Sequence, residues 1–379
     1  MNTLGLYLHV PFCLRKCPYC SFYSLAGRTD LHQRYAQAIS TQLRAFSEEY
    51  CDPQRPLTSV FFGGGTPTIL PPETLSRLLA ECLAQFSCAD GAEISIEVNP
   101  ATVNASELQV LRRAGFNRLS IGVQSLNDGE LRQLGRPHSV ADAVQTLQMA
   151  RAAGFDNINL DLMYGLPGQD PQSWQASLDR AVELQPEHLS IYELTIEEGT
   201  PFAQQQEQGR FSLPAEDAVL LMLEKTQQAL KQAGFDRYEI SNYAQPEGQC
   251  RHNINYWQNG EYIGLGAGAV AFFNGTRCTA IADADQFCER LEKGQDVWAE
   301  KEQLDRAAAF RETVITGLRM TAGISLAELT DRFGMEAEIY YGETLHRLVR
   351  QGLLHIVQDR LQLTPQGMLL ANTVMAELV

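Results

Sequence analysis

The chain has no long apolar run, and no basic segment followed by an apolar core stands at its start. No stretch approaches the roughly 20 apolar residues that a membrane-spanning helix needs. We therefore expect a cytosolic protein in a compartment that keeps thiols reduced. Basic residues are also scarce, because 30 Lys and Arg stand against 46 Asp and Glu. The net charge of −16 opposes nonspecific binding to nucleic acid or to an anionic membrane surface.

Three of the nine cysteines lie close together near the start of the chain. Cys13, Cys17 and Cys20 have the spacing C-x3-C-x2-C. Three thiolates on one short loop can hold three irons of a [4Fe–4S] cluster and leave the fourth iron open for chemistry. The other cysteines are scattered without the spacing of metal ligands, so we expect buried or inert thiols at Cys51, Cys82, Cys88, Cys250, Cys278 and Cys288.

Two other interpretations of the triplet remain open. A structural zinc site needs four ligands, and the nearest candidate for a fourth is His9. His9 alternates with leucines in an apolar, strand-like run, so we expect it to be packed or to line a cavity. A disulfide would leave one of the three cysteines unpaired and suits a secreted protein better. The spacing favours the cluster.

The first half of the chain repeats a strand-then-helix pattern. Apolar, β-branched runs predict six strands at Leu4–Val10, Ser59–Phe62, Glu93–Val98, Arg118–Val123, Asn157–Met163 and His188–Leu194. Helix-like stretches occupy Asp30–Phe46, Pro72–Gln85, Asn104–Ala114, Val140–Ala153 and Pro171–Leu184. This alternation is typical of parallel strands joined by crossover helices. We predict an α/β fold with a partial, open (β/α)6 barrel over residues 1–214, whose seam a later segment must cover.

The rest of the chain predicts an α+β extension in two parts. Residues 215–301 begin with a helix at Ala215–Ala233 and continue with strands at Arg237–Ile240 and Tyr262–Phe273. Residues 302–379 predict helices at Ala307–Met320, Ser325–Phe333 and Glu338–Gln351, a hairpin of Leu353–Val357 and Arg360–Leu363, and a last helix at Pro365–Leu378. This is the outline of a winged-helix-like domain. Its third helix and hairpin offer few basic residues, so we expect a structural or docking role and no nucleic-acid partner.

Unusual polar residues follow the predicted barrel strands. A glycine run that includes Gly64 and Gly65 comes after the second strand, Glu97 lies in the third, and Gln124 follows the fourth. The fifth strand carries Asp161, and Arg136 follows the fourth in L-G-R-P-H. Each has an ordinary structural explanation, such as a turn, a helix cap or a surface residue. Ligands of a parallel barrel bind where the strand ends meet, so their joint occurrence predicts a binding site. The glycine turn would offer backbone amides to a carboxylate or phosphate.

The motifs V-P-F-C-L-R-K-C-P-Y-C, F-G-G-G-T-P-T, I-E-V-N-P, I-G-V-Q-S and L-D-L-M-Y-G-L-P together resemble the radical S-adenosylmethionine (SAM) enzymes. Within them the chain is similar, over nearly its whole length, to the group of oxygen-independent coproporphyrinogen III oxidase and the HemW haem chaperones. The resemblance implies a [4Fe–4S] cluster on Cys13, Cys17 and Cys20, with SAM completing the open iron. In such enzymes, electron transfer to SAM gives methionine and a 5′-deoxyadenosyl radical. The resemblance further implies SAM contacts from Tyr7, Tyr19, Gly64, Gly65, Thr66, Glu97, Gln124, Arg136 and Asp161.

Two departures from the oxidase favour the haem-chaperone branch. The oxidase has a further cysteine two residues after the triplet, where this chain has Phe22. The oxidase also has a long N-terminal extension, whereas the first strand expected here begins at Leu4. The resemblance therefore implies a cytoplasmic protein that binds haem and transfers it to membrane haem proteins such as respiratory enzymes. Decarboxylation of coproporphyrinogen III is the alternative. The resemblance also allows a homodimer, and contact with the membrane through the acceptor proteins.

The segment from His252 to Trp257 matches the H-N-x-x-Y-W motif that the haem chaperones link with haem binding. A neutral imidazole is a good axial ligand for haem iron, and aromatic rings can pack on a porphyrin. The motif predicts His252 as a haem-binding residue. The alternative is a buried, hydrogen-bonded histidine, with Tyr256 and Trp257 in the core.

Overall fold

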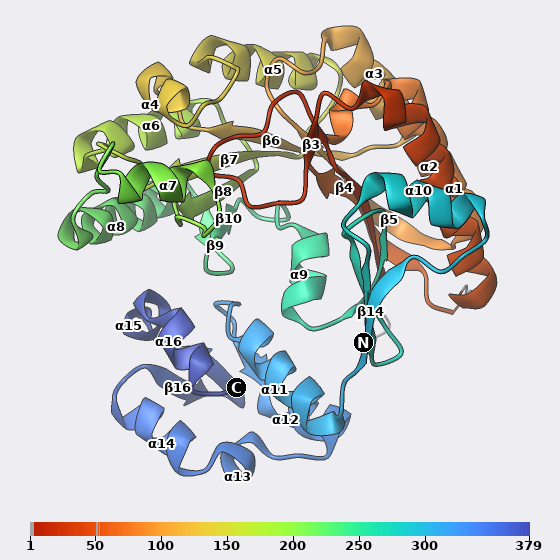
Figure 1. Cartoon of the computed structure of the whole chain (residues 1–379). Helices are drawn as coiled ribbons and strands as arrows, with labels where there is room; N and C mark the ends of the chain where they lie inside the picture. The colour runs from red at the N-terminus through yellow and green to blue at the C-terminus, as the bar shows by residue number, and fades with distance from the viewer. Residues whose placement is uncertain (1–3, 51, 53) are drawn as a thin grey trace.

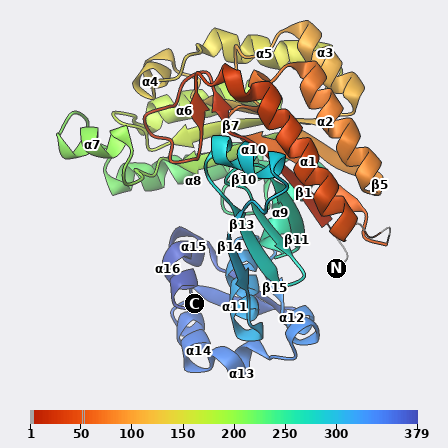
Figure 2. The same cartoon turned by 45° about the vertical axis from the view of Figure 1, so that its right-hand side comes forward.

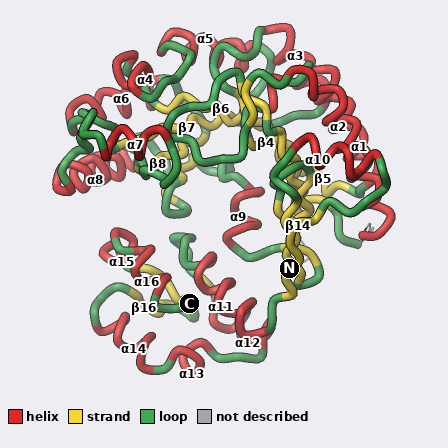
Figure 3. The backbone as a smooth tube through the Cα atoms, viewed as in Figure 1, coloured by secondary structure: helices red, strands yellow, loops and turns green. Residues whose placement is uncertain are grey.

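The structure is a computed structural model that describes residues 4–50, 52 and 54–379 (Figure 1). In this described part of the chain, 12 strands form one sheet in the order β14-β13-β12-β11-β1-β4-β5-β6-β7-β8-β10-β9. The sheet curves into an open barrel, with helices on its convex side (Figures 1 and 3). A second, smaller body follows in the sequence and lies beside the open side of the barrel (Figure 1).

All six strands predicted for the first half are confirmed. They are β1 (Leu4–Val10), β4 (Leu57–Gly64), β5 (Cys88–Val98), β6 (Arg118–Gln124), β7 (Ile158–Tyr164) and β8 (His188–Glu193). Each of these six strands pairs in parallel with the next one of the six. The prediction of a partial (β/α)6 barrel is therefore confirmed, and the carboxyl ends of the six strands share one mouth.

The helices between these strands are also close to their predicted bounds. The main ones are α1 (His32–Tyr50), α2 (Pro72–Gln85), α3 (Ala105–Ala114), α5 (Val140–Ala152) and α6 (Pro171–Glu183), with the shorter α4 (Asp128–Gln133) and α7 (Pro201–Glu207). Asn104 caps α3, and Ser139 caps α5, each in a reciprocal capping box. At its other end α3 stops at Gly115, whose φ of 116° a residue with a Cβ adopts only with strain.

The middle region widens the barrel sheet on both edges. Beyond β8 it adds β10 (Asn242–Ala244) and β9 (Asp236–Arg237), and beyond β1 it adds β11 (Glu261–Leu265), β12 (Val270–Phe273), β13 (Thr276–Ala280) and β14 (Trp298–Gln303). Three helices belong to it, α8 (Glu216–Gln232), α9 (Arg251–Trp257) and α10 (Ala284–Glu292). The strand predicted at Tyr262–Phe273 is two strands, because Gly266 and Gly268 turn the chain with φ of 109° and 77°. Only Arg237 of the predicted strand Arg237–Ile240 lies in β9.

Helix α9 (Arg251–Trp257) lies between the barrel and the C-terminal body (Figures 1 and 2). It packs against β1 and β4. The buried carboxylate of Glu93 accepts the first amides of the helix, from Arg251 at 2.9 Å and His252 at 3.3 Å. Negative charge is favourable at this end of a helix. On the other side, the guanidinium of Arg319 lies 4.3 Å from the ring centre of Trp257. Helix α9 therefore connects the amino ends of the barrel strands to the C-terminal body.

The C-terminal body has its own core, from Phe310 to Leu378, whereas one core runs from Leu4 to Val297. Its elements are α11 (Arg306–Gly317), β15 (Ile324–Ser325), α12 (Leu326–Phe333), α13 (Ala337–Tyr341), α14 (Glu343–Arg350), β16 (Leu354–Val357), β17 (Arg360–Leu363), α15 (Pro365–Leu369) and α16 (Ala371–Ala376). The domain limits at 214 and 301 stay predictions.

Two helices predicted in the C-terminal body are wrong as single helices. The segment Glu338–Gln351 breaks at Gly342, which has φ of 49° and ψ of −121° and so leaves the helical region. The segment Pro365–Leu378 breaks at Leu370, with φ of −113° and ψ of 25°. The hairpin is confirmed, and its turn places both Gln358 and Asp359 at positive φ.

The remaining cysteines partly follow expectation. Cys82, Cys250 and Cys288 are buried, but Cys278 is half-buried and Cys88 is exposed, and Cys51 lies outside the described residues. All the cysteines that the structure describes are free. Over the same residues, no helix has the length and apolar character to cross a membrane.

Candidate functional site

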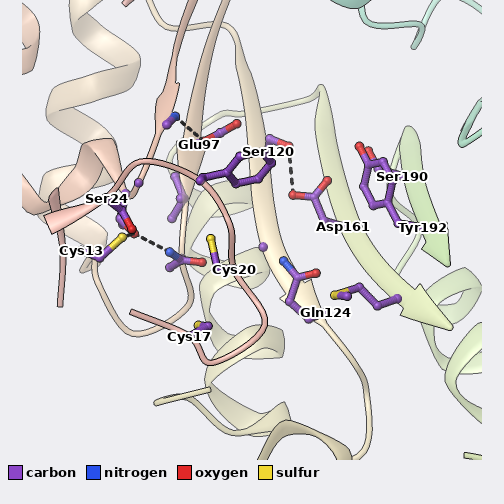
Figure 4. Close-up of a pocket in the computed structure, with 18 of the residues that line it drawn as sticks. Cys13, Cys17, Cys20, Ser24, Glu97, Ser120, Gln124, Asp161, Ser190 and Tyr192 are labelled. Carbon is purple, nitrogen blue, oxygen red and sulfur yellow. Dashed lines mark hydrogen bonds between the residues drawn. The ribbon is translucent and has the colours of Figure 1, made fainter. Parts of the chain in front are cut away.

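One cavity of about 680 Å³ inside the barrel brings together all the predicted site residues. Its lining includes Tyr7, Cys13, Cys17, Tyr19, Cys20, Gly64, Gly65, Thr66, Glu97, Gln124, Arg136, Asp161 and His252. Figure 4 shows the cysteines on one side and Glu97, Asp161 and Gln124 on neighbouring strands. The cavity runs from the carboxyl ends of the strands, where the cysteine loop lies, toward helix α9 at the amino ends of the strands, which we call the inner end of the cavity.

The cysteine loop follows β1 and is closed at its base. Two short parallel strands, β2 (Phe12–Cys13) and β3 (Leu25–Ala26), pair across it. Inside the loop the amide of Cys20 donates to the carbonyl of Cys17 at 3.1 Å, which forms a tight turn. Cys17 is buried, and burial raises the pKa of the thiols of Cys13 and Cys20. The loop therefore holds three free thiols at the mouth of the cavity.

The donor set fits a [4Fe–4S] cluster better than a single metal ion. Within the described ranges, no three His, Cys, Asp or Glu side chains converge as a ligand set for one ion. A cluster instead binds each thiolate to a different iron, so its ligands need not meet at one point. Three thiols around a mouth, with carboxylate and amide groups beyond them, fit a cluster with one open iron.

A chain of polar contacts ties two of these thiols to the strand ends. The hydroxyl of Thr66 lies 3.7 Å from Sγ of Cys13, and it accepts a hydrogen bond from the side-chain amide of Asn99 at 2.6 Å. Arg136 donates to Asn99 through Nη2, and its Nη1 lies 3.5 Å from Sγ of Cys17. The Nε of Arg136 is buried and has no partner within the described structure. Arg136 is thus placed beside a thiol as well as at the cavity wall.

The glycine turn after β4 packs differently from the sequence-based expectation. Its amides are not offered to a ligand: Gly64 donates to the carboxylate of Glu97 at 3.0 Å, and Gly65 donates to the carbonyl of Val10 at 2.9 Å. The amide of Thr66 donates to a carbonyl of the cysteine loop at 2.7 Å. The expectation of free amides at this turn is therefore wrong.

Close packing explains why glycine stands at this turn. A Cβ on Gly65 would lie 2.7 Å from the carbonyl oxygen of Phe12 and 3.0 Å from Sγ of Cys13. Gly64 has φ of 118°, and a Cβ there would meet the ring of His9 at 2.7 Å. The glycines let the cysteine loop lie directly against the end of β4.

Two carboxyl groups face the cavity from neighbouring regions of the sheet. Burial and then the charge of Asp161 raise the pKa of Glu97 to about 8. Burial also raises the pKa of Asp161. Hydrogen bonds from Asn159 at 2.7 Å and Ser120 at 3.5 Å lower this pKa, but burial has the larger effect. Carboxylates accept hydrogen bonds from hydroxyl groups, so this wall suits a ribose.

Gln124 has an unusual backbone at the end of β6. Its φ of 69° is in the left-handed region, which residues other than glycine rarely adopt. The register between β6 and β7 shifts just before it. Strained backbone of this kind concentrates at functional sites, and here it turns the chain where Gln124 lines the cavity.

At the inner end of the cavity, both ring nitrogens of His252 have partners. Nδ1 lies 2.8 Å from the hydroxyl of Ser59, and Nε2 lies 2.9 Å from the hydroxyl of Tyr256. The ring of Phe61 stacks on it, with 5.1 Å between centres. Burial, with the charge of Arg118, lowers the pKa of His252 to about 3, so the ring is neutral.

Several cavity residues escaped the sequence reasoning. Strand periodicity could have found them, because alternate residues of a strand share a face. Such residues are Ser120 and Gly122 before Gln124, Asn159 and Met163 around Asp161, and the pair Ser190 and Tyr192. Asn99, two residues after Glu97, follows the same rule. Arg118 lies buried at the start of β6 and also lines the cavity. The sequence did not indicate this, because a single arginine is usually a surface residue.

The raised pKa of Glu97 predicts a pH dependence of stability. The folded protein keeps a proton on Glu97 that the unfolded chain releases above its ordinary pKa of 4.5. Stability from this group therefore falls as pH rises from about 4.5 to about 8, and is constant beyond. Urea unfolding of ligand-free Glu97→Gln across this range should show a growing stability advantage over the wild type. Glu224→Gln, on the surface, is the control, and parallel curves for wild type and Glu97→Gln would contradict the assignment.

The contact of Arg136 with Cys17 predicts an effect on a bound cluster. A cation beside the thiolate favours the reduced, more negative cluster. Arg136→Gln should therefore lower the reduction potential of the reconstituted protein by tens of millivolts, the order expected for one charge-assisted contact, and reduce its iron content. Arg136→Lys should recover part of the potential, and Arg132→Gln, on the surface of α4, should change neither. Unaltered potential and iron content in Arg136→Gln would show that the contact does not act on the cluster.

Comparison with known proteins identifies the family of the chain. Residues 7–181 match the Radical SAM superfamily, and residues 304–370 match the HemN C-terminal domain. The chain is 33% identical to heme chaperone HemW of Bacillus subtilis, over 97% of each chain. It is 36% identical to heme chaperone HemW of Escherichia coli, over 99% of this chain and 98% of that protein. The mitochondrial radical S-adenosyl methionine domain-containing protein 1 of Danio rerio is 32% identical, over 98% of this chain and 86% of that protein.

A solved structure gives the same architecture. The coproporphyrinogen III oxidase HemN of Escherichia coli, a radical SAM enzyme, superposes with a TM-score of 0.86 at 26% identity. The match covers 99% of this chain and 89% of that one. The oxidase thus shares the barrel and the C-terminal body, whereas the identity to the heme chaperones of B. subtilis and E. coli is 33% and 36% over at least 97% of each chain. The chain belongs to the HemW family of the radical SAM superfamily.

Proposed function

We propose that this protein is a haem chaperone, which binds haem and transfers it to membrane haem proteins such as respiratory enzymes. The observation that carries the proposal is an identity of 33 to 36% to proteins named heme chaperone HemW, over at least 97% of this chain. Phe22, at the position of a further cysteine in the oxidase, supports the same branch. Haem is the cargo in this proposal.

We propose that Cys13, Cys17 and Cys20 hold a [4Fe–4S] cluster and that SAM binds beside it. Membership of the radical SAM superfamily implies both cofactors. When bound, they supply one-electron chemistry at the open iron. The proposed SAM contacts are Tyr7, Tyr19, Gly64, Gly65, Thr66, Glu97, Gln124, Arg136 and Asp161.

The contacts in the cavity suggest what these residues do. Arg136 and Asn99 would hold the cysteine loop in register and leave guanidinium nitrogen for an anionic group. Glu97 and Asp161 would accept hydrogen bonds from sugar hydroxyls. Tyr7 and Tyr19 would wall the cavity and keep water from it.

The proposed partners are haem and the haem proteins that receive it. We propose that the protein works in the cytoplasm and meets the membrane through those acceptors. A homodimer stays a prediction, as does the absence of a nucleic-acid partner, which the acidic net charge of −16 supports.

Coproporphyrinogen III decarboxylation is a second candidate, because HemN shares the fold at a TM-score of 0.86. It would use the same cavity to remove carboxyl groups from propionate side chains. Phe22 is an argument against decarboxylation, because the oxidase has a cysteine at that position and phenylalanine has no thiol.

Parallel assays on one preparation separate the two functions. The protein is reconstituted with iron and sulfide under anaerobic conditions, then tested for haem transfer to an apo acceptor and for decarboxylation of coproporphyrinogen III with SAM and a reductant. We expect haem binding and transfer without substrate-dependent 5′-deoxyadenosine. Cys17→Ser is the cluster-free control, and a full cluster in that variant would refute the ligand assignment. Decarboxylation without haem binding would overturn the proposal.

The two hydrogen bonds of His252 predict the outcome of a test at this residue. They disfavour ligation of haem iron by this ring in its present position, because a nitrogen that binds iron must first lose its hydrogen bond. We expect His252→Ala to keep the haem affinity and iron spectrum of the wild type and to lose about 2 kcal/mol of stability, from two buried hydrogen bonds. His346→Ala, at an exposed histidine, is the control. A changed axial-ligand spectrum in His252→Ala would support the ligation predicted from the motif.

A further inference from the structure

The cysteine loop carries an exposed apolar and basic surface at the mouth of the cavity. It consists of Leu14, Arg15, Lys16 and Phe22, which we call the mouth patch. The side chains of Leu14 and Phe22 are 60% and 69% exposed. Arg15, Lys16 and Phe22 line the opening of the cavity.

Nothing within the described chain occupies this surface. The ring of Phe22 stacks on no other aromatic ring there, and neither Arg15 nor Lys16 forms an ion pair with a described carboxylate. A single exposed apolar residue is ordinary. Two of them on one short loop, beside two unpaired cations in a protein of net charge −16, form a surface suited to a flat, apolar dianion.

We propose that the mouth patch is the haem-binding surface. The ring of Phe22 packs on the face of the porphyrin, and Leu14 adds apolar contact at its edge. Arg15 and Lys16 pair with the two propionates. This inference rests on the proposed haem-chaperone function and gives that function a site.

Solvent exposure favours the mouth over the interior as the place of the propionates. The charged groups that line the interior are Glu97, Asp161, Arg118 and Arg136, which are half-buried or buried. Taking a propionate charge out of water into such a site costs free energy. At the mouth, the same propionates meet two cations.

Release also favours the mouth. The inner end of the cavity is covered by α9, which is held by the carboxylate of Glu93 and packs against Arg319 of the C-terminal body. Cargo bound there could leave only along the whole cavity and past the cysteine loop. Haem on the exposed loop can pass to an acceptor without unfolding of the barrel.

The test measures the affinity of the full-length, cluster-loaded protein for haem and for haem dimethyl ester, whose propionates carry no charge. Phe22→Ala should weaken both ligands about tenfold, because both present the same ring face. Arg15→Glu/Lys16→Glu should weaken haem by tenfold or more and leave the ester unchanged. Iron content is measured in every variant.

Matched controls use the same changes elsewhere on the surface. Ile339→Ala removes an apolar side chain that is 76% exposed, and Arg113→Glu/Lys231→Glu reverses two exposed charges on α3 and α8. Both should bind as the wild type. If Phe22→Ala loses iron, Phe22→Leu keeps the bulk of the loop and still removes the flat ring, so its affinity for the ester should also fall.

The outcomes separate this inference from the proposed function. If the wild type binds haem and both patch variants bind it equally well, the inference is wrong and the function stands. If the patch variants change only the oligomeric state, the surface serves a second copy of the chain and the inference is again wrong. If the cluster-loaded wild type binds no haem, the proposed function itself fails.

Discussion

The attachment of the cysteine loop to the strand ends is the constraint on which the rest of the site depends. Cys13 contacts Thr66, Thr66 contacts Asn99, and Asn99 contacts Arg136, which reaches Cys17. The loop lies so close to β4 that a side chain on Gly65 would strike its backbone. These contacts turn three cysteines that are close in sequence into three thiols on one side of a shared cavity.

Solvent exposure and charge divide that cavity into two regions. Its interior holds two carboxyl groups together with Arg118 and Arg136, and burial, followed by the charge of Asp161, raises the pKa of Glu97 to about 8. Its mouth holds Arg15 and Lys16 beside exposed apolar side chains. An interior with hydrogen-bond acceptors suits a sugar with hydroxyl groups, and a basic, apolar rim suits a dianionic macrocycle. One barrel can therefore keep a cofactor and a cargo apart.

Much of this arrangement could be predicted from the sequence because barrel strands are local and periodic. The six strands followed from apolar runs, and residues at successive strand ends had to share one mouth. The glycine turn was misjudged, since its amides are used by Glu97 and Val10, and such long-range partners leave no mark in the local sequence. The breaks at Gly342 and Leu370 were missed because the apolar spacing continues across them. Arg118 was missed because its burial follows from the barrel, not from its neighbours in the chain.

The structure also gives the H-N-x-x-Y-W segment a physical role. His252 closes the inner end of the cavity through Ser59 and Tyr256, and Trp257 meets Arg319 of the C-terminal body. The segment thus connects the two cores. Hydrogen–deuterium exchange of the cluster-loaded protein, with and without haem, tests most directly where the cargo binds. We expect haem-dependent protection of amides in residues 11–25. Protection confined to residues 250–258 would contradict haem binding at the mouth patch.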